Sequence, residues 1–170
     1  MAYSMYEATV PVLARALRSL RGVLQKGEQW AADKGVAPEV LLGTRLMPDM
    51  LPLSRQVQIA TDMAKNAAGR LTGSALVPFA DDETTFAQLY ARIDRALGVV
   101  EGFSADQFAG AESRSVSLKT GGRDVTFQGA EYLAGFVLPN VFFHASIAYA
   151  ILREAGVPLG KLDFLGAAQD

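Results

Sequence analysis

The side chain with the clearest chemical potential is the single histidine of the sequence, His144, which lies in a stretch without charge. Asn140 precedes it by four residues, so on a helix both side chains would project from one face, about 6 Å apart. This is the spacing of an H-x-x-x-H metal pair, although asparagine is a poor zinc ligand. The pattern allows a hydrogen-bonded core histidine, a metal site, or a role in ligand binding or proton transfer.

Two glutamines on an earlier segment could face this histidine. Helical arithmetic places Gln56 beside the inner face of residues 53–71 and points Gln58 further away. A buried cluster of Gln56, Asn140 and His144 would have to be fully hydrogen-bonded, and it could be purely structural. Its alternative is a small polar pocket, for which the candidate residues are Gln56, Asn140, His144 and Tyr149.

Other kinds of site find little support. The chain has no cysteine, which excludes disulfides, thiolate zinc sites and a cysteine nucleophile. A lone histidine without a G-x-S-x-G motif gives no catalytic triad. The consecutive residues 81–83, Asp-Asp-Glu, resemble the start of a helix more than paired catalytic carboxylates. We assign no metal, no cofactor and no catalytic residue, and whether the protein is an enzyme stays open.

Composition indicates one globular domain spanning residues 1–170. Half of the residues are hydrophobic and a fifth are charged, with a net charge of −2 and a pI near 5.4. That balance gives no basic surface for nucleic acid. The N-terminus lacks the basic start and apolar run of a signal peptide, so we expect a cytoplasmic, bacterial-type protein.

Apolar periodicity predicts four helices that position these residues. Apolar residues recur at spacings of three and four, and so form an apolar seam, along residues 6–24, 53–71 and 86–100. A fourth, more apolar segment covers residues 138–152. Pro11 would either kink the first helix or mark its first turn. Residues 115–118 and 124–127 alternate around Gly121-Gly122, which predicts a small β-hairpin before the last helix. The long connection between the second and third helices allows a crossover.

The stretch from Tyr132 to Leu152 contains no charged residue and is long enough to raise a membrane span. Pro139 falls near its centre, polar side chains interrupt it, and no basic flank would orient it. We therefore expect a buried core helix and no membrane partner. Two adjoining apolar faces on this helix predict deep burial.

Two sequence blocks resemble an uncharacterised bacterial family of the DinB-like superfamily. They are Leu-Pro-Leu-Ser-Arg-Gln-Val-Gln-Ile-Ala at 51–60 and Leu-Pro-Asn-Val-Phe-Phe-His at 138–144, the latter followed by Tyr-Ala-Ile-Leu-Arg-Glu-Ala-Gly-Val-Pro-Leu-Gly-Lys at 149–161. The resemblance covers essentially the whole chain. It implies an all-α, up-down-down-up four-helix bundle that is often a homodimer.

The resemblance also implies a metal site that this chain does not reproduce. Many DinB-like proteins bind a divalent metal through three histidines, one from helix two and an H-x-x-x-H pair from helix four. His144 matches the second residue of that pair, Asn140 stands in place of the first, and helix two offers only Gln56 and Gln58.

We therefore expect a non-metal protein that binds a small ligand or serves a stress-related role, with a polar pocket around His144. The alternative is a metal-dependent thiol transferase or hydrolase with a degenerate site.

Overall fold

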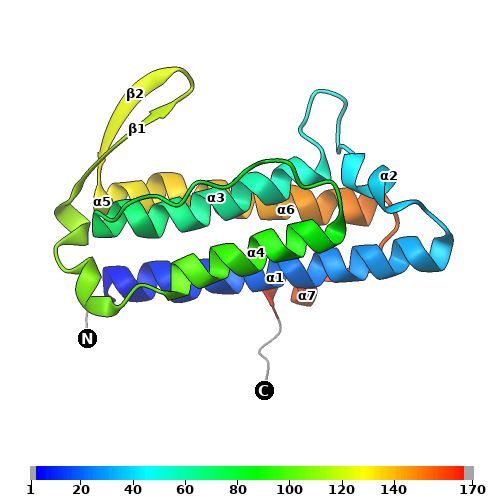
Figure 1. The fold of residues 1–170 in the computed structure, drawn as a ribbon, viewed down its shortest axis with the longest axis horizontal. Helices are drawn as coiled ribbons and strands as arrows, with labels where there is room; N and C mark the ends of the chain where they lie inside the picture. The colour runs from blue at the N-terminus through cyan, green and yellow to red at the C-terminus, as the bar shows by residue number, and fades with distance from the viewer. Residues whose placement is uncertain (1–2, 167–170) are drawn as a thin grey trace.

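Four long helices form the body of the molecule. The computed structural model describes residues 3–166. The long helices are α1 (Met5–Lys34), α3 (Leu53–Thr72), α4 (Phe86–Glu101) and α6 (Leu138–Glu154). Figure 1 shows α3 and α4 running opposite to α1, and α6 running with it, which confirms the up-down-down-up bundle.

Shorter elements connect these helices. They are α2 (Pro38–Gly43), η1 (Ala105–Phe108), η2 (Ala111–Ser113), β1 (Ser115–Thr120), β2 (Arg123–Gln128), α5 (Gly129–Glu131), η3 (Tyr132–Val137) and α7 (Lys161–Leu165). Because α3 and α4 run in the same direction, the chain between them must travel back along the bundle. Residues 74–85, here called the crossover segment, do so in extended form (Figure 1).

Pro11 lies inside α1 and does not begin it, since the helix starts at Met5 with a capping box between Ser4 and Glu7 and runs as one element to Lys34. Pro11 has no N–H to donate to the carbonyl of Glu7, four residues earlier. The hydroxyl of Tyr3 donates to that carbonyl at 3.0 Å instead. The free acceptor is thus satisfied and the helix continues.

The predicted hairpin forms between β1 and β2. The strands pair antiparallel, with Ser115 opposite Gln128 and Thr120 opposite Arg123. Gly121 and Gly122 both have positive φ angles, of 57° and 77°, as a two-residue turn of this hand requires. The hairpin projects from one end of the bundle (Figure 1).

A short π-helical segment, η3, precedes α6 and has an identifiable cause. Pro139 cannot donate a backbone hydrogen bond, and its ring would crowd the carbonyl of Gly135 in a regular α-helix. In the wider π-helical turn, each backbone N–H donates to the carbonyl five residues earlier instead of four. The N–H of Leu138 accordingly donates to the carbonyl of Leu133.

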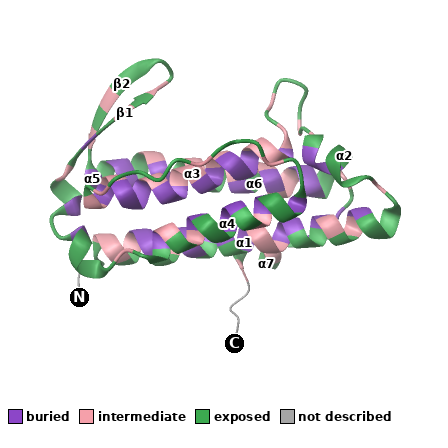
Figure 2. Ribbon diagram, in the orientation of Figure 1, coloured by how far each residue is buried: buried purple, intermediate pink, exposed green. Residues whose placement is uncertain are grey.

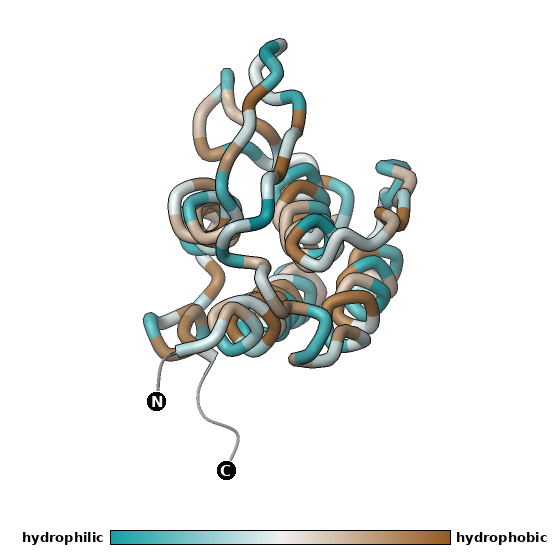
Figure 3. The backbone as a smooth tube through the Cα atoms, turned by 90° about the vertical axis from the view of Figure 1, so that its left-hand side faces the viewer, coloured by the Kyte–Doolittle hydropathy of each residue, from teal (hydrophilic) through white to brown (hydrophobic). Residues whose placement is uncertain are grey.

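The core lies between the four long helices, whose facing positions are buried, as the purple stripes in Figure 2 show. Figure 3 views the bundle along its length and shows hydrophobic residues interspersed with hydrophilic ones around the helices. α6 departs from expectation: in the most apolar part of the continuous helical stretch Gly129–Glu154, which includes α6, only 33% is buried. Phe142 and Phe143 are 40% and 55% exposed. The prediction of deep burial is wrong because α6 packs on α1 and α3 and leaves its outer face uncovered.

By length and composition, the continuous helical stretch Gly129–Glu154 is also apolar enough to cross a membrane. Core helices of water-soluble proteins meet the same criteria, so this property alone distinguishes nothing.

Candidate functional site

The structure brings His144 of α6 and Gln56 of α3 together across the bundle. His144 Nδ1 lies 2.7 Å from Gln56 Oε1, although the two residues are 88 positions apart. Gln56 is buried, and its Nε2 donates to the backbone carbonyl of Leu51 at 2.9 Å. Both ends of this amide are therefore engaged.

These two bonds determine the protonation pattern of the imidazole. A backbone carbonyl can only accept, so the Gln56 amide must present its nitrogen to Leu51 and its oxygen to His144. An oxygen acceptor requires a proton on His144 Nδ1. In the neutral ring, Nε2 then carries the lone pair and is available as a hydrogen-bond acceptor.

His144 favours this neutral form. It is half-buried, and desolvation lowers the pKa of its imidazole below the ordinary value of 6.5. Its Nε2 has no bonded partner within residues 3–166. That nitrogen is nevertheless not buried, because Thr9 Oγ1 is the one buried side-chain polar atom of the described chain that lacks a partner. Solvent or a ligand can therefore reach Nε2.

The other two candidate residues do not join this pair. Asn140 Nδ2 donates to the carbonyl of Phe136, one turn earlier on its own helix, at 2.6 Å. Tyr149 lies on another side of α6, where its hydroxyl is 3.5 Å from the carbonyl of Leu159 and its ring packs edge-on against Phe164. The expected three-residue network of Gln56, Asn140 and His144 is thus a two-residue pair.

The donor set does not fit the three-histidine metal centre that the family resemblance implies. Within residues 3–166, no three His, Asp or Glu side chains are grouped so that they could hold a metal ion. His144 uses Nδ1 as a donor to Gln56, and the Asn140 amide is bonded to its own helix. One free imidazole nitrogen is the single metal ligand that this arrangement provides.

A buried charged cluster on the opposite side of α3 was not foreseen. Arg92 of α4 is almost fully buried and forms ion pairs at 2.8–3.0 Å with Asp62, Asp81 and Glu83. It also donates to the hydroxyl of Thr61 and to the carbonyls of Gln58 and Ala80. Residues 81–83 are thus not merely a helix start, because two of their carboxylates bind the guanidinium.

A further set of contacts surrounds this cluster. Gln58, which is buried like Gln56, donates to Glu83 and accepts from Arg55. Desolvation raises the pKa of Asp81, but the hydrogen bonds and ion pairs with Arg55 and Arg92 together outweigh it, so the pKa lies below its ordinary value. The crossover segment is thereby fixed to α3 and α4.

The comparisons with known proteins agree with this fold. Residues 5–165 match the family model described as a domain of unknown function, DUF1993. The chain is 38% identical to a DinB family member protein from Shewanella denitrificans, whose crystal structure superposes with a TM-score of 0.89. That match covers 98% of this chain and 94% of the other. Among curated proteins, none matches. The chain therefore belongs to the DUF1993 family, an uncharacterised family of DinB-like helical bundles.

Proposed function

We propose that the protein binds a small, neutral molecule at His144 without a metal ion. The observation that carries this proposal is the bond from His144 Nδ1 to a Gln56 amide that Leu51 holds in one orientation. It fixes one tautomer and leaves Nε2 as an acceptor that no residue of the described range 3–166 uses. Because Nε2 is accessible from outside, it can accept a hydrogen bond from a ligand that carries a donor.

The surroundings indicate the class of ligand. The ring of Phe143 lies edge-on to the imidazole, with centroids 5.2 Å apart, and more than half of this side chain is exposed. Leu51, whose carbonyl anchors Gln56, is also exposed. A neutral acceptor beside apolar side chains favours a molecule with an apolar body and one hydroxyl or N–H group.

Titration with phenol tests this proposal. Phenol carries a hydroxyl donor on an apolar ring, and anisole is the matched compound without the donor. We expect phenol to shift the ¹⁵N resonance of His144 Nε2 and anisole to leave it nearly unchanged. The response should weaken in Gln56→Ala, which removes the partner of Nδ1, and persist in Gln58→Ala. Equal shifts with both compounds, or no shift with either, would contradict the proposal.

The alternative of a metal-dependent thiol transferase or hydrolase has less support, because the described chain lacks a second and a third ligand beside His144. Stoichiometric zinc or nickel that disappears in His144→Ala would favour that alternative.

The proposal includes self-association through the exposed outer face of α6. Phe143 exposes more than half of its aromatic side chain on a helix that carries no charge between Tyr132 and Leu152. A second copy of the chain could cover this face. Sedimentation should show a dimer that Phe143→Glu converts to a monomer, whereas Val40→Glu, at an exposed apolar position on α2, should leave it dimeric. A wild-type monomer at high concentration would contradict this part of the proposal.

A further inference from the structure

A second candidate binding site lies on the other flank of α6, away from His144. There a cavity of about 270 Å³ opens between α1, α6 and α7. This volume is close to the lower end of the range for small-molecule pockets, about 300–1,000 Å³. Its walls are formed mainly by Val12, Arg15, Ala16, Phe142, Phe164 and Leu165.

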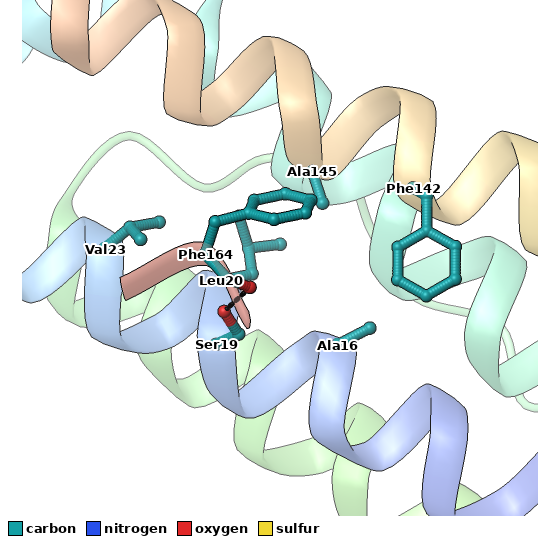
Figure 4. A pocket seen from close by; sticks show the side chains of 7 residues that line it. All are labelled: Ala16, Ser19, Leu20, Val23, Phe142, Ala145 and Phe164. Atoms are coloured by element: carbon teal, nitrogen blue, oxygen red, sulfur yellow. Dashed lines mark hydrogen bonds between the residues drawn. The ribbon is translucent and has the colours of Figure 1, made fainter. Parts of the chain in front are cut away.

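The apolar part of this cavity is built by two aromatic side chains at a seam of small residues. Figure 4 shows a smaller neighbouring pocket that shares both aromatic side chains with this cavity. In it, Phe142 points from α6 into the space between α6 and α1, and Phe164 lies between the same two helices near Ala145. Ser19 of α1 donates to the carbonyls of Asp163 and Phe164 and so holds α7 in place. The hollow is therefore bounded by α7 on one side.

The charge at this cavity is supplied by one guanidinium, that of Arg15. Arg15, Arg18 and Arg21 follow one another along the exposed face of α1. Arg18 forms an ion pair with Glu101, and Arg21 forms one with Asp94 at 3.0 Å. Within residues 3–166, Arg15 has no carboxylate partner, and it is the member of the three that borders the cavity.

We propose that this cavity binds a small carboxylate with an apolar body. The apolar chain would lie against Phe142, Phe164 and Val12, and its carboxylate would pair with Arg15 at the rim. Charge complementarity selects an anion over a neutral molecule of the same shape. The site is independent of His144, which faces α3 from another side of α6.

Octanoate and 1-octanol form a matched pair of probes, since they share an alkyl chain and differ in charge. Calorimetric titration of the full chain at pH 7.5 should give tighter binding of octanoate than of 1-octanol. The expected ratio is about fivefold, which is modest because Arg15 is exposed and the ion pair is screened by solvent.

Three variants test which residues carry this preference. Arg15→Leu should bring octanoate binding down to that of 1-octanol, whereas Arg18→Leu, three residues along the same face, should preserve the difference. Val12→Phe should fill the hollow and weaken both probes.

Circular dichroism would show that each variant is folded. Equal binding of both probes to the wild type, or an octanoate preference that survives Arg15→Leu, would overturn the proposal. So would failure of both probes to bind, which is the result expected if a second copy of the chain covers the cavity.

Discussion

Two polar centres flank α3, and they differ in how completely their groups are paired. On the α4 side, Arg92 uses all of its nitrogens, in bonds to six different residues. On the α6 side, His144 bonds to a single residue among those that the structure describes, Gln56. One centre is closed to further partners and the other keeps an acceptor open.

The difference separates a structural role from a candidate functional one. Burying a guanidinium is costly unless every donor is satisfied, and a satisfied cluster fixes one arrangement of the segments that it joins. The Arg92 cluster joins the crossover segment to two helices, so it supports the parallel course of α3 and α4. The imidazole of His144, with one nitrogen hydrogen-bonded to Gln56 and the other free, stabilises the fold less than the Arg92 cluster does and can still bind a ligand.

The largest effect should follow from breaking the closed centre. Arg92→Leu removes the cation that Asp62, Asp81 and Glu83 share, and leaves those carboxylates close together. We expect a loss of about 3 kcal/mol in the free energy of unfolding, at the lower end for buried pairs because two of the carboxylates are partly exposed.

Urea denaturation measures this loss. The matched control is Arg95→Leu, since Arg95 stacks on the ring of Phe79 and forms no ion pair within the described chain. It should cost less than about 1 kcal/mol. Equal losses in the two variants would show that the cluster has no special structural role.

A smaller effect should distinguish the two buried glutamines of α3. Gln58→Ala removes bonds to charged partners, Glu83 and Arg55, and should cost about 2 kcal/mol. Gln56→Ala removes bonds to His144 and Leu51 and should cost about 1–2 kcal/mol. Denaturation gives both values, and NMR should find a changed tautomer balance at His144 in Gln56→Ala alone. The same tautomer in both variants would mean that Gln56 does not orient the imidazole.

The smallest effect concerns pH. Burial lowers the pKa of His144 in the folded state. At pH values between this lowered pKa and 6.5, the unfolded chain therefore binds more protons than the folded chain. Stability should therefore fall as pH drops below 6.5 and level off beneath the folded pKa.

Denaturation midpoints at pH 7.5 and 5.5 measure this effect, and the decrease should be smaller in His144→Ala. At still lower pH, the contribution of Asp81, present above the ordinary carboxylate pKa of 3.8, should be lost as that group is protonated. An unchanged pH dependence in His144→Ala would contradict the assignment.

Much of the bundle was predictable because apolar spacing along a helix directly reflects burial. The apolar seam over residues 53–71 predicts a helix that matches α3 (Leu53–Thr72), and the alternating pattern around Gly121-Gly122 predicts the hairpin that β1 and β2 form. The π-helical segment before α6 was not predicted, since a proline at position 139 can be accommodated in several ways that local sequence does not distinguish.

The candidate site was predictable only in part. The pairing of Gln56 with His144 follows from inward-facing positions on two helices, but Asn140 satisfies its amide on its own helix, an option that a spacing rule ignores. The Arg92 cluster was missed because its partners are far apart in sequence. An arginine at an inward-facing position of the 86–100 seam was the signal that could have revealed it.

The most direct test of this account is the protonation pattern of its single histidine. Long-range ¹H–¹⁵N NMR at pH 7.5 should show His144 as the neutral tautomer protonated on Nδ1, with spectra unchanged after one equivalent of zinc. A ring protonated mainly on Nε2, or stoichiometric zinc that is lost in His144→Ala, would contradict the claim that Gln56 holds this imidazole as a metal-free acceptor.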